Sequence, residues 1–249
     1  MIEIHPLLGL GEVDEGEDLG RILSEAMAPF RPASGDLLVV TQKIVSKAEG
    51  RVAYLSRMRP GAQALELAEK TRKDPRFVEL VLAESSEVVR AVPGVLITRH
   101  KLGFVMANAG IDCSNVGPHG EDKALLLPAD PDASAARLRA SVHERLGVEM
   151  GIIVSDSFGR PWRNGVVNVA LGSAGVPALH DRRGSKDRDG RELRVTQIAF
   201  GDLIASAAGL VMGEAEEGIP AAYLRGCNLP AGDVPSAKLL RNIDEDLFR

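Results

Sequence analysis

Apolar positions along the chain fall into two patterns, short continuous runs and longer stretches with helical spacing. The short runs are rich in Val, Ile and Leu and end in turn residues, which predicts β-strands at residues 36–41, 95–98, 104–107, 151–154, 166–171 and 193–198. The longer stretches predict helices at residues 62–70, 76–89, 133–146 and 201–211. Strands and helices do not alternate strictly, so we predict an α+β fold of mixed sheets with packed helices.

Individual residues indicate where two of these helices begin and end. Asp74-Pro75 suits the start of the helix at 76–89, because proline is tolerated in the first helical turn. Asp132 suits the N-cap of the helix at 133–146, and Gly147 suits its C-terminal end.

Composition narrows the class of protein. The 249 residues predict a single domain over residues 1–249, with two subdomains of unassigned boundary as the alternative. The net charge of −5 argues against a nucleic-acid partner. No apolar run is long enough to span a membrane, and the acidic N-terminal segment does not resemble a signal peptide, so we expect a cytoplasmic protein. Two cysteines are too few for a disulfide scaffold or a zinc cluster.

Asp112, in the string NAGIDCSNVG, is the first candidate for chemistry. It follows an apolar run and has small or polar neighbours, including Ser114 and Asn115. Such oxygen-bearing groups suit Mg²⁺ or Mn²⁺. An Asx-turn that only satisfies backbone amides explains the string equally well. Both interpretations are open at this stage.

The string VSDSFGRPWRNG, residues 154–165, is the second candidate. Asp156 and Ser157 offer oxygen ligands, while Arg160 and Arg163 suit phosphate or carboxylate groups. The alternative is an ordinary strand-to-loop junction in which Asp156 caps a turn and both arginines are exposed. Two arginines so close behind an acid favour a binding site.

Glu214, in the string VMGEAEEGIP, follows the expected end of a helix and has Glu216 and Glu217 nearby. Carboxylates at that end oppose the helix dipole unless a cation or solvent compensates. Solvent compensates such carboxylates more commonly, and a metal ion is the other possibility.

Two basic segments are candidates for contact with an anion. Lys43 and Lys47 lie just beyond a buried strand, with Gln42 directly before them and Ser46 between them, where the lysines suit a phosphate or are simply exposed. The charged segment at residues 180–192 is either a solvated loop or a basic loop over an anionic ligand.

In this order, the strings resemble the coenzyme F420-0:L-glutamate ligase family, the F420 γ-glutamyl ligases. The resemblance extends over nearly the whole chain, through GLGE, GDLLVVTQKIVSKAEGR, NAGIDCSNVG, LLPADPDASAARLR, VSDSFGRPWRNG and GRELRVTQIAFGDLIASAAGLVMGEAEEGIPAAYLRG. It implies a GTP-dependent ligase that joins L-glutamate to the terminal carboxylate of F420-0 through an acyl phosphate. Further γ-linked glutamates follow, with release of GDP and phosphate.

The resemblance also implies an intertwined homodimer of α+β subunits without a phosphate-binding loop. The sequence contains neither the GxxxxGK[ST] nor the GxGxxG motif. The partners implied are small molecules, namely F420-0, L-glutamate and GTP.

The site residues follow from the same resemblance. It implies two divalent cations, Mg²⁺ or Mn²⁺, with K⁺ as a further candidate. Asp112 and Asp156 would hold the first cation, and Ser157 and Glu214 the second. The GTP contacts fall on Leu10, Gly11, Glu12, Val13, Gln42, Lys43, Lys47 and Asn115. Asp112, Asp156 and Arg160 are the expected catalytic residues. Relatives often have Gly-Leu-Pro at the Gly-Leu-Gly of residues 9–11, and Ser-Thr or Ser-Lys at Gln42-Lys43.

Two other functions compete with a ligase. A metal-dependent phosphohydrolase would use the same acids to activate water. A nucleotide- or flavin-binding module would bind its ligand without turnover. The dispersed acids fit a ligase because the attack of a carboxylate on a phosphate brings two anions together, which metals and cations make tolerable.

Overall fold

The structure is a computed structural model that describes residues 1–114 and 122–246. Its centre is a five-stranded mixed sheet in which β2 and β8 are parallel and the other neighbouring pairs are antiparallel. In order across the sheet, the strands are β1 (Glu3–Pro6), β12 (Ala221–Arg225), β2 (Leu37–Thr41), β8 (Gly151–Arg160) and β9 (Arg163–Ala174). Helices pack on this sheet, which confirms the predicted α+β class.

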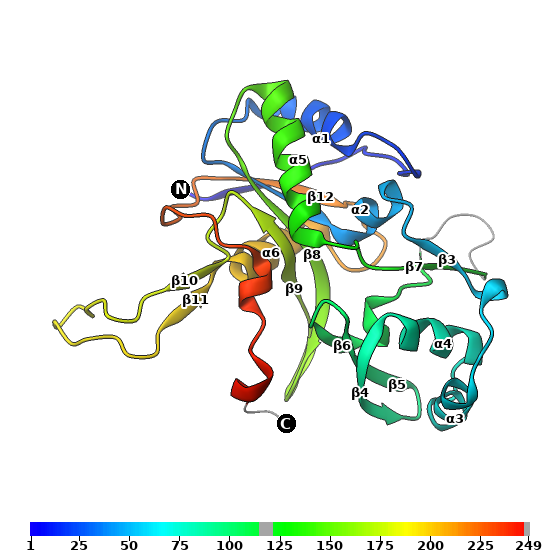
Figure 1. The fold of residues 1–249 in the computed structure, drawn as a ribbon. Coiled ribbons are helices and arrows are strands. Elements are labelled where there is room, and N and C mark those ends of the chain that lie inside the picture. Colours follow the sequence, from blue (N-terminus) through cyan, green and yellow to red (C-terminus); the bar gives the residue numbers. More distant parts are fainter. Residues whose placement is uncertain (115–121, 247–249) are drawn as a thin grey trace.

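Helices cover both faces of the central sheet (Figure 1). Successive strand residues point to opposite faces, so Leu38 joins the core beneath α1 and α5, whereas Val39 joins the core beneath α6. None of the helices in the described part of the chain has the length and apolar character of a membrane span. The helices of this layer are α1 (Leu19–Met27), α2 (Gln42–Ala48), α5 (Pro131–Leu146) and α6 (Phe200–Met212).

Residues 52–114 and 122–125 form a second region beside the sheet, at the lower right of Figure 1. It buries its own apolar cluster, which includes Val78, Val81 and Leu96. A pair of strands, β3 and β7, and a three-stranded sheet, β4–β5–β6, frame this cluster. The elements are β3 (Val52–Tyr54), α3 (Ala62–Thr71), α4 (Pro75–Ala83), β4 (Ser85–Val92), β5 (Val95–His100), β6 (Val105–Ala107) and β7 (Lys123–Leu125).

The helix predicted at 76–89 is wrong in its second half. Asp74 caps α4 and Pro75 is its first residue, as predicted, but the helix ends at Ala83. The chain then continues as β4, whose residues pair antiparallel with β5. Its Val-Val pair fits helix and strand patterns alike, and cross-strand pairing decides in favour of the strand.

Asp132 is not a helix cap. Asp130 caps α5 with Pro131 as the first helical residue, and Gly147 ends the helix in a left-handed conformation as predicted. The Asp132 carboxylate instead accepts backbone hydrogen bonds from Ser173 and from residues 236 and 237. It therefore ties α5 to β9 and to the C-terminal segment.

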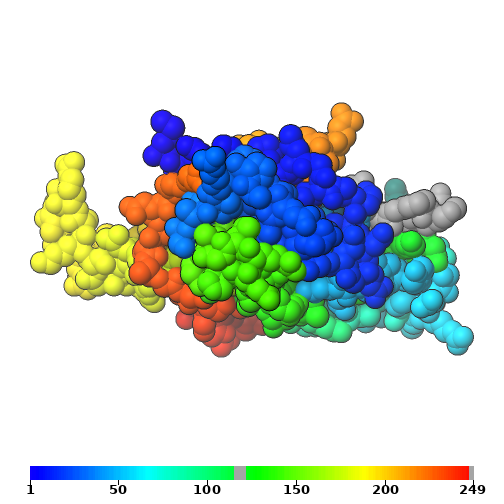
Figure 2. All heavy atoms as spheres, turned by 90° about the horizontal axis from the view of Figure 1, so that it is seen from above, coloured from blue at the N-terminus to red at the C-terminus, as the bar shows by residue number. Residues whose placement is uncertain are grey.

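Three predicted strands have different limits in the structure. The strand expected at 151–154 continues to Arg160 as β8, and the strand at 166–171 lengthens to β9. The strand at 193–198 shrinks to β11 (Gln197–Ala199), which pairs with β10 (Leu179–Asp181). Between these two strands, the charged segment projects away from the body (Figures 1 and 2). This arm does not line the cleft at the carboxyl ends of β2 and β8, which favours the solvated-loop interpretation.

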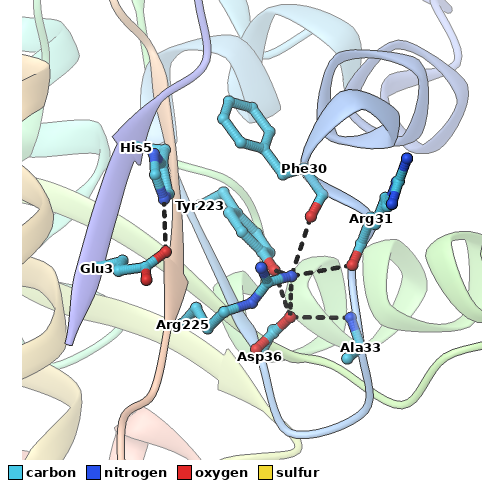
Figure 3. Close-up of polar contacts among 8 residues, drawn as sticks. All are labelled: Glu3, His5, Phe30, Arg31, Ala33, Asp36, Tyr223 and Arg225. Carbon is cyan, nitrogen blue, oxygen red and sulfur yellow. Dashed lines mark hydrogen bonds and ion pairs between the residues drawn. The ribbon is translucent and has the colours of Figure 1, made fainter. Parts of the chain in front are cut away.

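A buried polar cluster lies at the amino end of β2, around Asp36 and Tyr223 (Figure 3). The Tyr223 hydroxyl donates to Asp36, and Arg225 donates to the Tyr223 hydroxyl (2.5 Å) and to Asp36 (3.3 Å). Arg225 also donates to the carbonyls of Phe30 and Arg31. Burial and the neighbouring Asp36 carboxylate raise the pKa of Tyr223 above its ordinary value. The cluster therefore holds a neutral phenol against an ion pair.

Candidate active site

A cleft of about 1100 Å³ opens at the carboxyl ends of the parallel strands β2 and β8. Loops that follow parallel strands converge at this edge of a sheet, which makes it a common place for ligands. The walls come from the segment at 11–13, from α2, from β5 and β6, from the turn that carries Asp112, from β8, and from the loop after α6. The tertiary structure thus brings all four strings singled out in the sequence to one cavity.

Asp112 reaches the cleft through a strained turn. Asn108, Ala109 and Gly110 have consecutive positive φ values of 52°, 53° and 70°. Only glycine adopts that region freely, so the first two residues carry a conformational cost that the surrounding packing offsets. Asp112 then exchanges two backbone hydrogen bonds with Leu125 of β7, which fixes its position.

The Asx-turn interpretation of Asp112 is confirmed, and the metal-site interpretation stays a prediction. The Ser114 amide donates to Asp112 Oδ1 (2.7 Å), which is the local turn, while Asp112 Oδ2 pairs with Lys43 Nζ at 2.5 Å in the cleft. Burial acts to raise the pKa of Asp112, but the Lys43 ammonium and the Ser114 groups outweigh it and lower that pKa. Asp112 is therefore an ionised carboxylate whose charge faces the cavity.

Asp156 and Ser157 lie within β8, not at a strand-to-loop junction. β8 and β9 form a hairpin that extends beyond the rest of the sheet, with register shifts at Val154/Ser155 and Gly159/Arg160. Asp156 and Ser157 lie between these shifts, and both line the cleft. Burial, with smaller contributions from the charges of Asp112 and Glu214, raises the pKa of Asp156 to about 7. Lys43 and the Ser157 amide act in the opposite direction. The site therefore holds a carboxylate that lacks enough positive charge around it.

Glu214 lies on an exposed loop that lines the same cleft. Gly213 ends α6 with a φ of 74°, and Glu217 accepts a hydrogen bond from the Ala215 amide, which shapes the turn. Glu216 and Glu217 also line the cavity. This loop adds negative charge to the wall that faces Asp156.

Most of the residues predicted to contact GTP line the cleft as well. Gly11, Glu12 and Val13 form part of its wall, and Lys47 pairs with Glu12 at 2.8 Å. The buried Gln42 accepts a hydrogen bond from Ser46 (3.0 Å). One described residue among the predicted contacts does not fall on the wall: Leu10 packs against the core beneath α1. Asn115 lies outside the described residues.

The two arginines of the β8–β9 hairpin have different positions. Arg160 lines the cleft, and its Nη2 donates to the carbonyl of Asn164 at 3.4 Å. Its Nε is buried and has no hydrogen-bond partner among the described residues. Arg163 is exposed and does not line the cleft. Arg160 is thus the better candidate for an anionic ligand.

Within residues 1–114 and 122–246, no three Asp, Glu, His or Cys side chains form a ready-made metal cage. Asp112, Asp156, Ser157 and Glu214 share one cavity, but they do not close around a single point. Mg²⁺ commonly takes only one or two protein carboxylates and completes its shell with waters and substrate phosphates. The oxygen donors here fit that kind of open site.

Asn168 is a cleft residue that the sequence patterns did not single out. It lies on β9 in register with Ser157 and is 9% exposed. Its signal in the sequence is a single amide within the apolar run VVNVALG. A lone polar residue in a strand is common, so that signal alone does not mark a site.

Comparisons with known proteins agree on one family. The sequence model of the F420-0:Gamma-glutamyl ligase family matches residues 8–226. A protein named coenzyme F420:L-glutamate ligase from Methanopyrus kandleri is 43% identical over 252 residues, which cover 100% of this chain and 98% of that protein. The protein of the same name from Methanocaldococcus jannaschii is 43% identical over 91% of this chain and 90% of its own length. That from Halobacterium salinarum is 42% identical over 97% of this chain and 93% of its own length.

Proposed function

Because this chain belongs to the F420-0:γ-glutamyl ligase family, we propose that it joins L-glutamate to coenzyme F420-0 and then adds further γ-linked glutamates. The observation that carries this proposal is the match of almost the whole chain to the family, together with one cleft that collects its candidate residues. GTP would supply the energy and leave as GDP and phosphate.

The chemistry requires activation of the acceptor carboxylate. In the first step, a carboxylate oxygen of F420-0 attacks the γ-phosphorus of GTP, the bond between the γ-phosphorus and the bridging oxygen breaks, and GDP leaves. The glutamate amine then attacks the carbonyl carbon of the acyl phosphate, loses a proton, and displaces inorganic phosphate. Both reactants of the first step are anions, so positive charge in the cleft is essential.

We assign the positive side chains of the cleft to this task. Lys43 and Lys47 pair with Asp112 and Glu12, and each ammonium could turn to a nucleotide phosphate without leaving the cleft wall. The buried, unpaired Nε of Arg160 suits a further oxyanion. Gln42 and the backbone of residues 11–13 would contact the rest of the nucleotide.

The donor set fits two divalent cations. We propose that Asp112 and Asp156 hold one Mg²⁺ or Mn²⁺ and that Ser157 and Glu214 hold the other, with K⁺ as a further candidate. The raised pKa of Asp156 supports this assignment, because a half-buried carboxylate beside other carboxylates lacks a compensating cation. When bound, such cations neutralise the phosphates of the nucleotide.

A single incubation tests the function. The protein with F420-0, GTP, L-glutamate and Mn²⁺ should yield GDP and a product that mass spectrometry finds heavier by one glutamyl residue. Reactions that each lack one component are the controls. Phosphate release without glutamate or F420-0 would instead establish a phosphohydrolase. Ligand binding without any turnover, unaffected by Asp156→Ala, would establish a binding module.

The resemblance also leads us to propose a homodimer. Light scattering of the purified protein should then give about twice the chain mass of 26.5 kDa. A mass equal to one chain would contradict it.

A further inference from the structure

Asn168 lines the cleft where β9 of the central sheet meets α6. Its partner in the register across β8 and β9 is Ser157, so the carboxamide is next to the proposed metal-binding segment. Asn168 Oδ1 lies 1.8 Å from where a Cβ would stand on Gly209 of α6. The carboxamide therefore fits between strand and helix only because residue 209 has no side chain.

The Asn168 side chain is held in place but lacks hydrogen-bond partners. Its backbone carbonyl accepts from Ser206 Oγ at 2.7 Å, which ties β9 to α6 at this position. Within the described residues, the carboxamide itself makes no hydrogen bond. Asn168 as a whole is only 9% exposed, but its carboxamide atoms are not among the fully buried unpaired atoms of the described residues, so solvent in the cleft reaches them. A bound ligand can displace that solvent and accept the hydrogen bond instead.

The surrounding charges favour a particular kind of ligand atom. Asp156 and Glu214 make this end of the cleft acidic, so an anionic substrate needs donors there in addition to cations. A carboxamide donates through its N–H groups at every pH, and it adds no charge that would compete for the metal ions.

We propose that the Asn168 carboxamide donates a hydrogen bond to an oxyanion, a phosphate or carboxylate oxygen, of a substrate bound beside Ser157. The proposal rests on the ligase function proposed above, which brings both kinds of oxyanion to the cleft. The phosphate would come from the nucleotide, and the carboxylate from glutamate or from the acceptor.

Two substitutions at the position test it. Asn168→Ala removes the donor, and Asn168→Asp keeps the shape but places a negative charge against the oxyanion. Loss of a hydrogen bond to a charged group should weaken binding of the affected substrate by roughly 10- to 100-fold in Asn168→Ala. We expect a larger loss in Asn168→Asp. Asn164→Asp is the matched control, because Asn164 lies exposed on the same strand and outside the cleft wall.

The measurements separate the two sources of oxyanion. Calorimetry with GTP and Mn²⁺ gives the nucleotide Kd, and steady-state kinetics gives the KM values for L-glutamate and F420-0. A rise confined to the GTP Kd identifies a phosphate, whereas a rise confined to one KM identifies the carboxylate of that substrate. Circular dichroism checks that each variant is folded, since a structural role alone would not change one affinity selectively.

Gly209→Ala provides an independent variant that keeps the amide. The added Cβ would collide with Asn168 Oδ1 and displace the carboxamide, so the same substrate should lose affinity. The proposal is wrong if both Asn168 variants bind GTP, glutamate and F420-0 within about twofold of wild type. If the wild type makes no glutamylated product, the proposed function fails instead. Calorimetric titration of wild type and of Asn168→Ala with GTP and with glutamate then tests the role of Asn168. Equal affinities of the two proteins, or no binding to either protein, would contradict the proposed hydrogen bond.

Discussion

Asp156→Asn should stabilise the metal-free protein, and more so at high pH. The cleft raises the pKa of Asp156 from 3.8 to about 7, so the folded state disfavours the charged carboxylate. Because the pKa of this carboxyl group is raised on folding, the contribution of Asp156 to stability is greatest below pH 3.8 and falls as the pH rises toward 7. Relative to a protein in which Asp156 kept its ordinary pKa, the free energy of unfolding is lower by ~4 kcal/mol at pH 8 and by ~1.5 kcal/mol at pH 5. Partial exposure of the side chain makes these values upper bounds.

Urea unfolding at pH 5 and pH 8, in the presence of a chelator, measures this difference. Far-UV circular dichroism is the suitable probe, because the only tryptophan, Trp162, is 79% exposed and would respond weakly. The free energy of unfolding of Asp156→Asn should exceed that of wild type at both pH values, and the excess should be up to about 2.5 kcal/mol larger at pH 8 than at pH 5. Asp130→Asn is the control, since Asp130 is exposed and asparagine caps a helix equally well.

Added Mn²⁺ should reverse the order of stability. A divalent cation binds a carboxylate more strongly than a carboxamide, so saturation should stabilise wild type far more than Asp156→Asn. Equal pH dependence of the two proteins between pH 5 and 8 would refute the raised pKa. An equal response of the two proteins to Mn²⁺ would refute Asp156 as a metal ligand.

Three further substitutions test other parts of the structure. Arg160→Ala should lower kcat/KM of the ligase reaction by roughly 10- to 100-fold, because Arg160 lines the cleft. Arg163→Ala should leave kcat/KM nearly unchanged, because Arg163 does not line it. Equal effects of the two substitutions would contradict this assignment. Tyr223→Phe removes the hydroxyl that donates to the buried Asp36 carboxylate, so the free energy of unfolding should fall by about 1–3 kcal/mol while the KM values stay unchanged. Altered KM values would show that this buried cluster affects the cleft. Gly172→Ala would place a Cβ 2.1 Å from the carbonyl oxygen of Pro131, so thermal unfolding should reveal a loss of about 1–3 kcal/mol; an unchanged melting temperature would show that α5 can move away without cost.

Local chemistry in the sequence was sufficient for some ends of helices and for the candidate residues. Asp74-Pro75 begins α4 and Gly147 ends α5, because caps and turns depend on one or two residues and their own backbone. The candidate acids were also visible, since the residue types that hold metals and phosphates are few. Their roles remain predictions.

Local chemistry was insufficient where two local structures fit the same residues. The Val-Val pair of β4 forms a strand because it pairs with β5. Asp130, and not Asp132, caps α5, because the Asp132 carboxylate accepts hydrogen bonds from three backbone amides of distant segments. β8 continued past Ser155 because β9 pairs with it as far as Arg160, despite two register shifts. In each case the deciding partner is remote in sequence.

By itself, the sequence determined the family, the fold class and the residue types available for chemistry. The tertiary structure decided which of those residues share a cavity: it brought Asp112, Asp156 and Glu214 to one cleft, moved Arg163 outside it, and added Asn168. The physical reason is that a side chain's identity is local, whereas its burial, its charged neighbours and its unmet hydrogen bonds arise only when distant strands and helices pack together.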